Sequence, residues 1–224
     1  MTSGEILPEP VRRYLAHALP SGETGAPGIK LTMSGRIKVG IWLPFGATQW
    51  CDGKSFLWRA SVGLGHMRPL VVTDRYQRGE GSVIGKLVGR RTLFEQTDSN
   101  VVRSAAARTA LEAVFAPRGF VPGRGYAWRA EDEDHIVASI ELPPEHVEVH
   151  LGIAPDGRLL NVVAQRWGEG TKGTFCYLPF GADMHEERRF GDVVIPSRVT
   201  AGWNYGTDGY SPFFKATITT AIAA

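Results

Sequence analysis

Three ionisable residues alternate with two valines in the segment His146-Val147-Glu148-Val149-His150. On a β-strand this alternation places the histidines and the glutamate on one face and both valines on the other. Neighbours on one face lie about 6.6 to 7 Å apart at Cα, so the two histidines would be roughly 13 Å apart and could not share one metal ion along a regular strand. We therefore expect no metal site here. His146 and Glu148 are a candidate pair for acid–base catalysis, and the alternative is a solvated or cavity-lining polar face.

A second ionisable cluster, Asp183-Met184-His185-Glu186-Glu187, has a histidine beside carboxylates. A histidine whose tautomer is oriented by a carboxylate can act as a general base. On a strand, His185 and Glu187 would share a face, whereas Glu186 would point with Arg188 to the opposite face. His185 and Glu187 are therefore a second candidate catalytic pair. The alternative is that these charges form salt bridges with neighbouring strands.

Aromatic residues occur in phase with aliphatic residues in two strand-like segments. Trp203 and Tyr205 continue the alternation of apolar positions that begins at Val193. Phe56 and Trp58 are two residues apart in an earlier segment and would share one face of that strand. Filling of the core is the favoured role, because most of the six tryptophans must be buried. If the sheet is curved and incompletely filled, the same rings would line a pocket for an apolar ligand.

Two arginines, Arg166 and Arg198, lie in segments whose other residues are apolar. An arginine in such a setting needs an acidic partner or an anionic ligand. Asp74, Glu187 and Asp208 are available as partners. We favour structural salt bridges and keep ligand binding as the alternative.

Five consecutive residues, Leu-Pro-Phe-Gly-Ala, occur twice, at 43–47 and at 178–182. The favoured interpretation is a strand interrupted by proline, with the phenylalanine in the core and the glycine supplying a backbone angle that other residues resist. In the alternative, both copies lie at the rim of a common cavity, which makes Phe180 a candidate ligand-binding residue.

The elements that must position these residues begin with a helix predicted from Pro8 to Leu19, followed by a loop of turn-forming residues up to position 28. Alternation from Ile29 to Ile41, with a bulge or bend near Gly35, begins an antiparallel meander over 29–97. A later strand of this meander is predicted from Ser82 to Phe94.

An Ala-rich run from Asn100 to Ala116 predicts a second helix within 98–118, which Asp98, Ser99 or Asn100 can cap and Pro117 ends. Strand patterns resume over 119–224 as a second antiparallel meander. No linker separates the halves, so we expect residues 1–224 to form a single domain. The predicted fold class is α+β, mainly antiparallel β, with a curved sheet or half-barrel wrapped around the N-terminal and mid-chain helices.

The composition narrows the class of protein. With 43% hydrophobic residues the chain can bury a substantial core, and 25 Lys plus Arg against 23 Asp plus Glu leave a net charge of +2, which does not favour nucleic-acid binding. Cys51 and Cys176 are too few for a disulfide scaffold and are expected to be free. Because neither a signal peptide nor an apolar run of ~20 residues is found, we expect a cytoplasmic protein without stable membrane insertion.

Motifs for known cofactors and nucleophiles are missing from the sequence. There is no Gly-x-Ser-x-Gly, no P-loop and no Cys-x-x-Cys, and Gly79-Glu80-Gly81 falls in a predicted hairpin turn. We therefore expect no cofactor. A basic stretch with Arg78, Lys86, Arg90 and Arg91 could touch phosphate or a membrane surface, but we favour a role in protecting exposed strands from edge pairing.

A set of short motifs resembles a bacterial family of unknown function that is common in actinobacteria. The resemblance covers nearly the whole chain and is found at 7–15 (Leu-Pro-Glu-Pro-Val-Arg-Arg-Tyr-Leu), 165–168, 178–181, 187–191, 195–198, 202–208 and 213–214. More remotely, the layout is similar to the lipoprotein-carrier (LolA-like) half-barrels. That second resemblance implies a concave sheet face that holds acyl chains.

Three functions remain open from the sequence. The preferred one is binding of an apolar small molecule or acyl chain in a concave pocket that includes Phe56, Trp58, Arg166, Phe180, Arg198, Trp203 and Tyr205. The second is a cofactor-independent enzyme, of cyclase, isomerase or hydrolase type, that uses one of the two His–Glu pairs on an apolar substrate in that pocket. In the third, the aromatic residues fill the core and the protein is a structural or partner-binding module.

Overall fold

The structure is a computed structural model and describes residues 7–22, 25–64 and 67–224. Over these residues the chain forms the helices α1 (Glu9–Ala18) and α2 (Ser99–Glu112), the short 3-10 segments η1 (Ala113–Phe115) and η2 (Thr171–Gly173), and thirteen strands. The strands of the first half are β1 (Ile29–Val39), β2 (Ile41–Cys51), β3 (Phe56–Leu64), β4 (Met67–Gln77), β5 (Glu80–Leu87) and β6 (Arg91–Gln96). Those of the second half are β7 (Ala127–Ala130), β8 (His135–Leu142), β9 (Glu145–Ile153), β10 (Leu159–Glu169), β11 (Phe175–Phe190), β12 (Val193–Trp203) and β13 (Ser211–Ala223).

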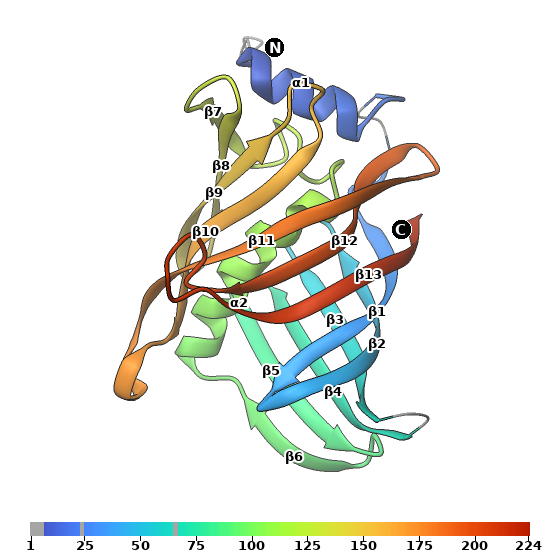
Figure 1. Cartoon of the computed structure of the whole chain (residues 1–224), viewed down its shortest axis with the longest axis vertical. Coiled ribbons are helices and arrows are strands. Elements are labelled where there is room, and N and C mark those ends of the chain that lie inside the picture. Colours follow the sequence, from blue (N-terminus) through green and yellow to red (C-terminus); the bar gives the residue numbers. More distant parts are fainter. Residues whose placement is uncertain (1–6, 23–24, 65–66) are drawn as a thin grey trace.

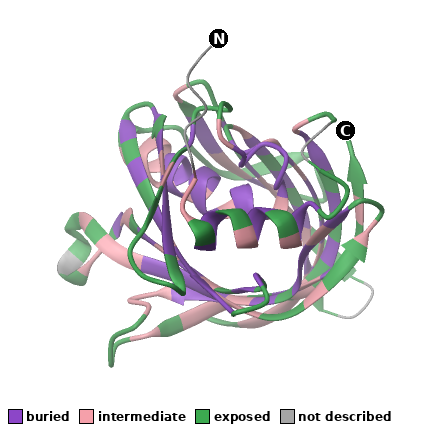
Figure 2. Cartoon of the chain, turned by 90° about the horizontal axis from the view of Figure 1, so that it is seen from above, coloured by how far each residue is buried: buried purple, intermediate pink, exposed green. Residues whose placement is uncertain are grey.

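All thirteen strands form one antiparallel sheet, in the order β6-β5-β4-β3-β2-β1-β13-β12-β11-β10-β9-β8-β7. Each half is a meander, and the halves join where the first strand pairs with the last, with Ile29 opposite Ala223 and Ile37 opposite Phe214. The sheet curves around the helices (Figures 1 and 2). The predicted α+β fold with a curved, mainly antiparallel half-barrel is confirmed.

Helix α2 lies inside the curve of the sheet, where it contacts strands of both halves, β10 and β9 on one side and β5 and β4 on the other. Small side chains allow this close packing: Ala105, Ala106 and Ala110 are buried, and a Cβ on Gly81 of β5 would lie only 3.0 Å from the Cα of Val102. Asp98 caps the helix by accepting hydrogen bonds from the backbone N–H groups of Asn100 and Val101. The helix is thereby fixed against the concave face.

Helix α1 lies across one end of the sheet, near β7, β8 and β12 (Figure 1). Its buried face includes Val11, Tyr14 and Leu15, as the periodicity predicts. Tyr14 packs on Phe120 and Trp128, with ring centroids 6.3 and 6.1 Å apart. This aromatic cluster packs α1 against the end of the molecule that the helix covers.

Two predicted strands are each divided by a turn. The segment Ile29–Ile41 turns at Gly40 (φ 70°), and Ser82–Phe94 turns at Val88 and Gly89 (φ 53° and 69°). At Gly40 the apolar alternation continues through the turn, because Val39 pairs with Ile41 and paired residues share one face. The bulge expected near Gly35 is also misplaced: the register shift lies between Thr32 and Met33. Gly35 instead allows close approach of β13, because a Cβ there would lie 1.9 Å from the carbonyl oxygen of Lys215.

Candidate ligand-binding cavity

A cavity of about 270 Å³ lies between the concave face of the sheet and α2. This volume is near the lower end of the ~300–1,000 Å³ range of small-molecule sites. The lining is mainly apolar and comes from both halves of the sheet and from the helix: Met33, Ile37, Trp58, Val72, Val83, Leu111, Phe115, Val162, Phe180, Ala182, Met184, Val199, Ala201, Phe213, Phe214, Ala216 and Ile218. Such a wall favours an apolar ligand.

A β-bulge turns two adjacent rings of β13 toward the cavity. Ala201 pairs with Phe214 but Gly202 pairs with Pro212, so Phe213 is an extra residue in β13. An extra residue in one strand interrupts the alternation of faces. Both Phe213 and Phe214 consequently line the cavity.

The two copies of Leu-Pro-Phe-Gly-Ala lie in β2 and β11, two strands away from β13 on either side. Phe45 stacks on Phe214 at 5.1 Å between centroids and lies behind the cavity wall, whereas Phe180 packs on Phe213 at 6.0 Å and lines the cavity. Both phenylalanines are buried, as favoured. The expected special backbone angle at the glycines is wrong, because neither has a positive φ.

One face of α2 brings polar groups to the cavity. Arg108 donates from Nη1 to Asp74 Oδ2 at 2.5 Å and from Nε to Glu112 Oε1 at 2.8 Å, and Gln49 Nε2 donates to Glu112 Oε2 at 2.9 Å. Burial alone would lower the pKa of Arg108, but Glu112 and Asp74 outweigh it and raise that pKa. Burial raises the pKa of Glu112, and Arg108 opposes this only in part. Arg108 thus has its charge compensated within the wall.

Arg166 of β10 also lines the cavity, and its environment is different. Its Nε donates to the backbone oxygen and to Oγ of Ser104, both at 3.1 Å. Its guanidinium carbon lies 4.6 Å from the ring centroid of Phe180 and 5.0 Å from that of Trp203. Burial and the nearby Arg108 lower the pKa of Arg166 to about 10, so the group remains charged at neutral pH.

No ion pair joins Arg166 to any carboxylate in the described part of the chain, although a structural salt bridge was favoured from the sequence. Of the three residues considered as partners, Asp74 pairs with Arg108 and Glu187 pairs with His17, whereas Asp208 forms no ion pair with any described residue. A buried guanidinium has five N–H donors. The Nη donors of Arg166 therefore remain available to a ligand.

Two further polar atoms in the lining residues are buried without a hydrogen-bond partner among the described residues: Trp58 Nε1, a donor, and Asp74 Oδ1, an acceptor. An unsatisfied buried group of this kind costs about 1–3 kcal/mol. Arg166, in contrast, presents its unpaired Nη groups as a polar position suited to the head group of a ligand.

The structure separates the seven predicted ligand-binding residues into three groups. Trp58, Arg166 and Phe180 line the cavity. Phe56 and Trp203 support it from behind, since Phe56 lies against Arg108 at 4.5 Å and Trp203 against Phe180 at 4.9 Å. The other two, Arg198 and Tyr205, do not line it.

Arg198 lies on the convex face, because its strand neighbour Val199 lines the cavity and successive side chains point to opposite faces. The guanidinium of Arg198 forms an ion pair with Glu186 at 2.8 Å, so the predicted salt bridge exists with a different carboxylate. Tyr205 follows the end of β12 and donates its hydroxyl to Asp183.

The predicted pair of His185 and Glu187 is not in contact. Register shifts between Met184 and Glu186 and between Glu186 and Glu187 interrupt the alternation of β11. His185 Nε2 lies 2.9 Å from Thr200 Oγ1, whereas Glu187 pairs with His17 of α1 at 2.8 Å. Neither residue lines the cavity, and their catalytic role stays a prediction.

The alternating segment of β9 has the predicted geometry, with Val147 and Val149 buried and the polar residues on the outer face. Each polar residue has its own partner: His146 pairs with Glu141 at 2.6 Å and Glu148 with Arg129 at 3.3 Å. His146 and Glu148 do not line the cavity either, so this pair also remains an untested prediction.

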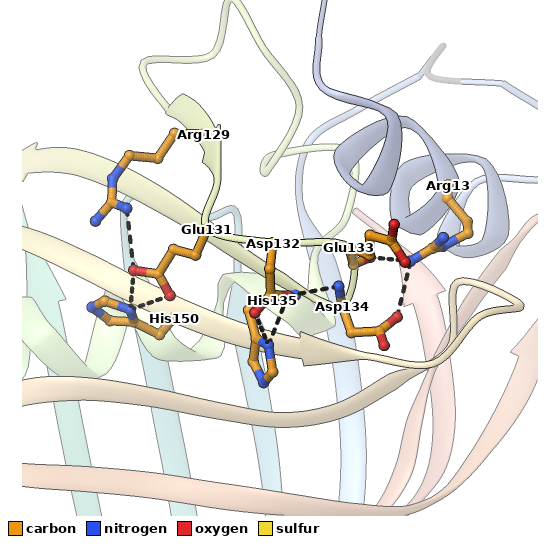
Figure 3. Close-up of polar contacts among 8 residues, drawn as sticks. All are labelled: Arg13, Arg129, Glu131, Asp132, Glu133, Asp134, His135 and His150. Carbon is orange, nitrogen blue, oxygen red and sulfur yellow. Dashed lines mark hydrogen bonds and ion pairs between the residues drawn. The ribbon is translucent and has the colours of Figure 1, made fainter.

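The same outer face continues toward α1, as Figure 3 shows. His150 and Arg129 both contact Glu131, and His135 Nδ1 lies 2.9 Å from both oxygens of Asp132. Partial burial alone would raise the pKa of Glu131, but the hydrogen bonds from His150 and Arg129 lower it. Within residues 7–22, 25–64 and 67–224, no group of three or more His, Cys, Asp or Glu side chains is arranged to hold a metal ion.

Sequence reasoning missed Arg108, Glu112 and Gln49 as cavity residues. A usable signal existed for two of them, because Arg108 and Glu112 are four residues apart in an Ala-rich helix and flank Leu111, so they share its inward face. Gln49 alternates in phase with Phe45 and Ala47, so the pattern of β2 placed it on the inward face, but only the packing of α2 brings it to Glu112.

A family model described as a family of unknown function (DUF6544) matches residues 2–216. No curated protein matches the chain. Among solved structures, a DUF1329 family protein from Desulfovibrio piger is similar with a TM-score of 0.51 at 8% identity, covering 96% of this chain and 90% of that one. A LolA superfamily protein from Nitrosomonas europaea is similar with a TM-score of 0.50 at 7% identity, covering 96% and 92%. At these identities the likeness concerns the fold, and the family model shows that the chain belongs to the family of unknown function DUF6544.

Proposed function

We propose that the protein binds one apolar small molecule or acyl chain in the cavity between α2 and the concave face. The observation that supports this most strongly is the mainly apolar lining with the unpaired Arg166 in its wall. Apolar contacts would supply most of the binding free energy, and a few polar groups would orient the ligand.

The polar atoms suggest the chemistry of the ligand's head group. Arg166 lines the cavity with Nη groups that form no hydrogen bond to a described residue, and these groups are donors, so the head group offers an acceptor oxygen. A carboxylate fits a guanidinium best, because two parallel N–H···O bonds can form. We therefore propose a fatty acid as the ligand type, with the carbonyl of an acyl ester as a weaker match.

Acid–base catalysis finds no support in this geometry, because His185, Glu187, His146 and Glu148 do not line the cavity. The proposed activity is therefore binding.

The test is the affinity of the purified protein for a long-chain fatty acid and for its methyl ester, measured by displacement of a fluorescent acyl probe. Removing a hydrogen bond to a charged group costs about 1.5–3 kcal/mol, so Arg166→Gln should weaken fatty-acid binding by roughly tenfold or more and ester binding by less. Arg198→Gln is the matched control and should leave both affinities unchanged, because Arg198 lies on the convex face.

Two results would count against the proposal. Failure of the unmodified protein to bind either acyl ligand would contradict the binding function. Equal loss in Arg166→Gln and Arg198→Gln would contradict the position of the head group.

A further inference from the structure

Three hairpins of the first half of the sheet have their tips at the same end of the molecule, because alternate ends of an antiparallel meander lie at one edge. The tips consist of Val39 and Ile41 beside the β1–β2 turn, Leu64 and Met67 at the paired ends of β3 and β4, and Val88 in the β5–β6 turn. Figure 1 shows the β1–β2 and β5–β6 turns in its lower part, at the end opposite α1. Their side chains are therefore available to one common surface.

Large apolar side chains are exposed at each of these tips. The exposed fractions are 59% for Val39 and 65% for Ile41 in the first hairpin, 65% for Leu64 and 79% for Met67 in the second, and 69% for Val88 in the third. A single exposed apolar residue is ordinary, but a group on three adjacent tips marks an interaction site.

The same hairpins are strongly basic. Segments 36–41, 64–68 and 86–94 contain no Asp or Glu and hold Arg36, Lys38, Arg68, Lys86, Arg90 and Arg91. In a chain with a net charge of only +2, this is a local concentration of positive charge. None of the six forms an ion pair with any residue that the structure describes. Their charge is therefore free to attract an anionic partner.

The third tip is built in a strained conformation. Val88 has a φ of 53° and Gly89 a φ of 69°, a turn for which Asn-Gly is the preferred sequence. A β-branched residue with positive φ is an outlier, and such strain gathers at functional sites. Here the strained residue is an exposed apolar one.

The tips are also continuous with the cavity face. Ile37 lines the cavity, and Val39, two residues later in β1, lies on the same face. Leu64 continues the face of the buried Val62 in the same way. Apolar residues of the concave face thus extend from the cavity to the exposed tips.

We propose that these three hairpin tips dock on the surface of an anionic lipid bilayer. The apolar side chains enter the interfacial region and the surrounding cations face lipid phosphates. The apolar tips distinguish this partner from a nucleic acid, which would need only the charge. Neither helix among the described residues has the length and apolar character to cross a bilayer. The proposal does not depend on what the cavity binds.

The test is co-sedimentation of the full chain with vesicles of mixed phosphatidylcholine and phosphatidylglycerol, compared with vesicles of phosphatidylcholine alone. The unmodified protein should bind the anionic vesicles much more strongly and lose binding in high salt. A surface-proximal cation contributes about fivefold in affinity, so the triple variant Lys38→Gln, Arg90→Gln, Arg91→Gln should bind on the order of 100-fold more weakly. The matched control, Lys30→Gln, Arg59→Gln, Arg78→Gln, changes exposed cations outside these tips and should bind normally.

Val88→Asn tests the apolar contact separately. Asparagine suits the positive φ, so this variant should be at least as stable in urea, yet bind anionic vesicles roughly fivefold to tenfold more weakly because one apolar contact is lost. Absence of binding by the unmodified protein, equal loss in the control triple, or unchanged binding of Val88→Asn would each overturn the proposal. If Val88→Asn binds the vesicles as the unmodified protein does, and the unmodified protein binds RNA as tightly as it binds anionic vesicles, the surface is a general site for polyanions and not a membrane site.

Discussion

At the scale of single residues, the cavity wall contains four charged groups in two different states. Arg108 is compensated by Asp74 and Glu112, whereas Arg166 has hydrogen bonds only to Ser104 and aromatic rings on either side. Burying a charge without a partner is costly, so a group that remains unpaired in an apolar cavity is a good candidate for ligand recognition. This difference could not be read from the sequence, since it depends on side chains from β4, β10 and α2 meeting in space.

Glu112 makes the stability of the protein depend on pH in a defined direction. Burial raises the pKa of Glu112 above its ordinary value of 4.5. A carboxyl group whose pKa is higher in the folded state contributes stability that is complete below the unfolded pKa and is lost as pH rises through the folded pKa. This component of the free energy of unfolding should therefore decrease as pH rises above about 4.5.

Glu112→Gln removes that component. The free energy of unfolding of the unmodified protein minus that of Glu112→Gln should be larger at acidic than at neutral pH, as measured by urea denaturation across a pH series. Glu80→Gln, at an exposed position in β5, is the matched control. A difference that stays constant or grows with pH would show that burial does not dominate at Glu112.

At the scale of elements, the local patterns predicted most of the strands and both helices. The helix within 98–118 is found as α2 and η1, with Asp98 as its cap. The errors lie at Gly40 and Val88. At Gly40 the turn preserves the apolar alternation, because Val39 pairs with Ile41, and so leaves no break in the pattern. A valine in a turn that favours asparagine or glycine gave no turn signal at all.

The repeated Leu-Pro-Phe-Gly-Ala motif gives an element-scale prediction, because its two glycines have different surroundings. A Cβ on Gly181 in β11 would lie 2.5 Å from the ring of Tyr205 and 2.8 Å from the backbone oxygen of Val162. A Cβ on Gly46 in β2 would meet only Nη1 of Arg68, the flexible end of an exposed side chain, at 2.6 Å. Gly181→Ala should destabilise the protein by about 1–3 kcal/mol, and Gly46→Ala by less than about 0.5 kcal/mol.

The measurement for this pair is the midpoint of urea denaturation of each variant. Equal midpoints for Gly181→Ala and Gly46→Ala would contradict the prediction, because they would mean that the ring of Tyr205 moves away from β11 without cost.

At the scale of the whole molecule, the pairing of β1 with β13 joins the two halves of the sheet. Strand β13 supplies Phe213 and Phe214 to the cavity, and both halves of the sheet contribute residues to the cavity wall. The resemblance to lipoprotein-carrier half-barrels predicted the curved sheet, and the structural neighbours confirm that fold. The cavity itself depends on a bulge in β13 and on the position of α2, which are long-range features that periodicity does not contain.

The central claim is that the cavity holds one acyl ligand, and native mass spectrometry tests it most directly. After incubation with a long-chain fatty acid, the unmodified protein should show a mass with one bound acid. Ala201→Phe and Ala216→Leu add volume to the cavity wall and should reduce this species strongly while retaining the circular dichroism of the unmodified protein. A protein that carries no bound acid, or folded variants that bind as well as the unmodified chain, would contradict the claim.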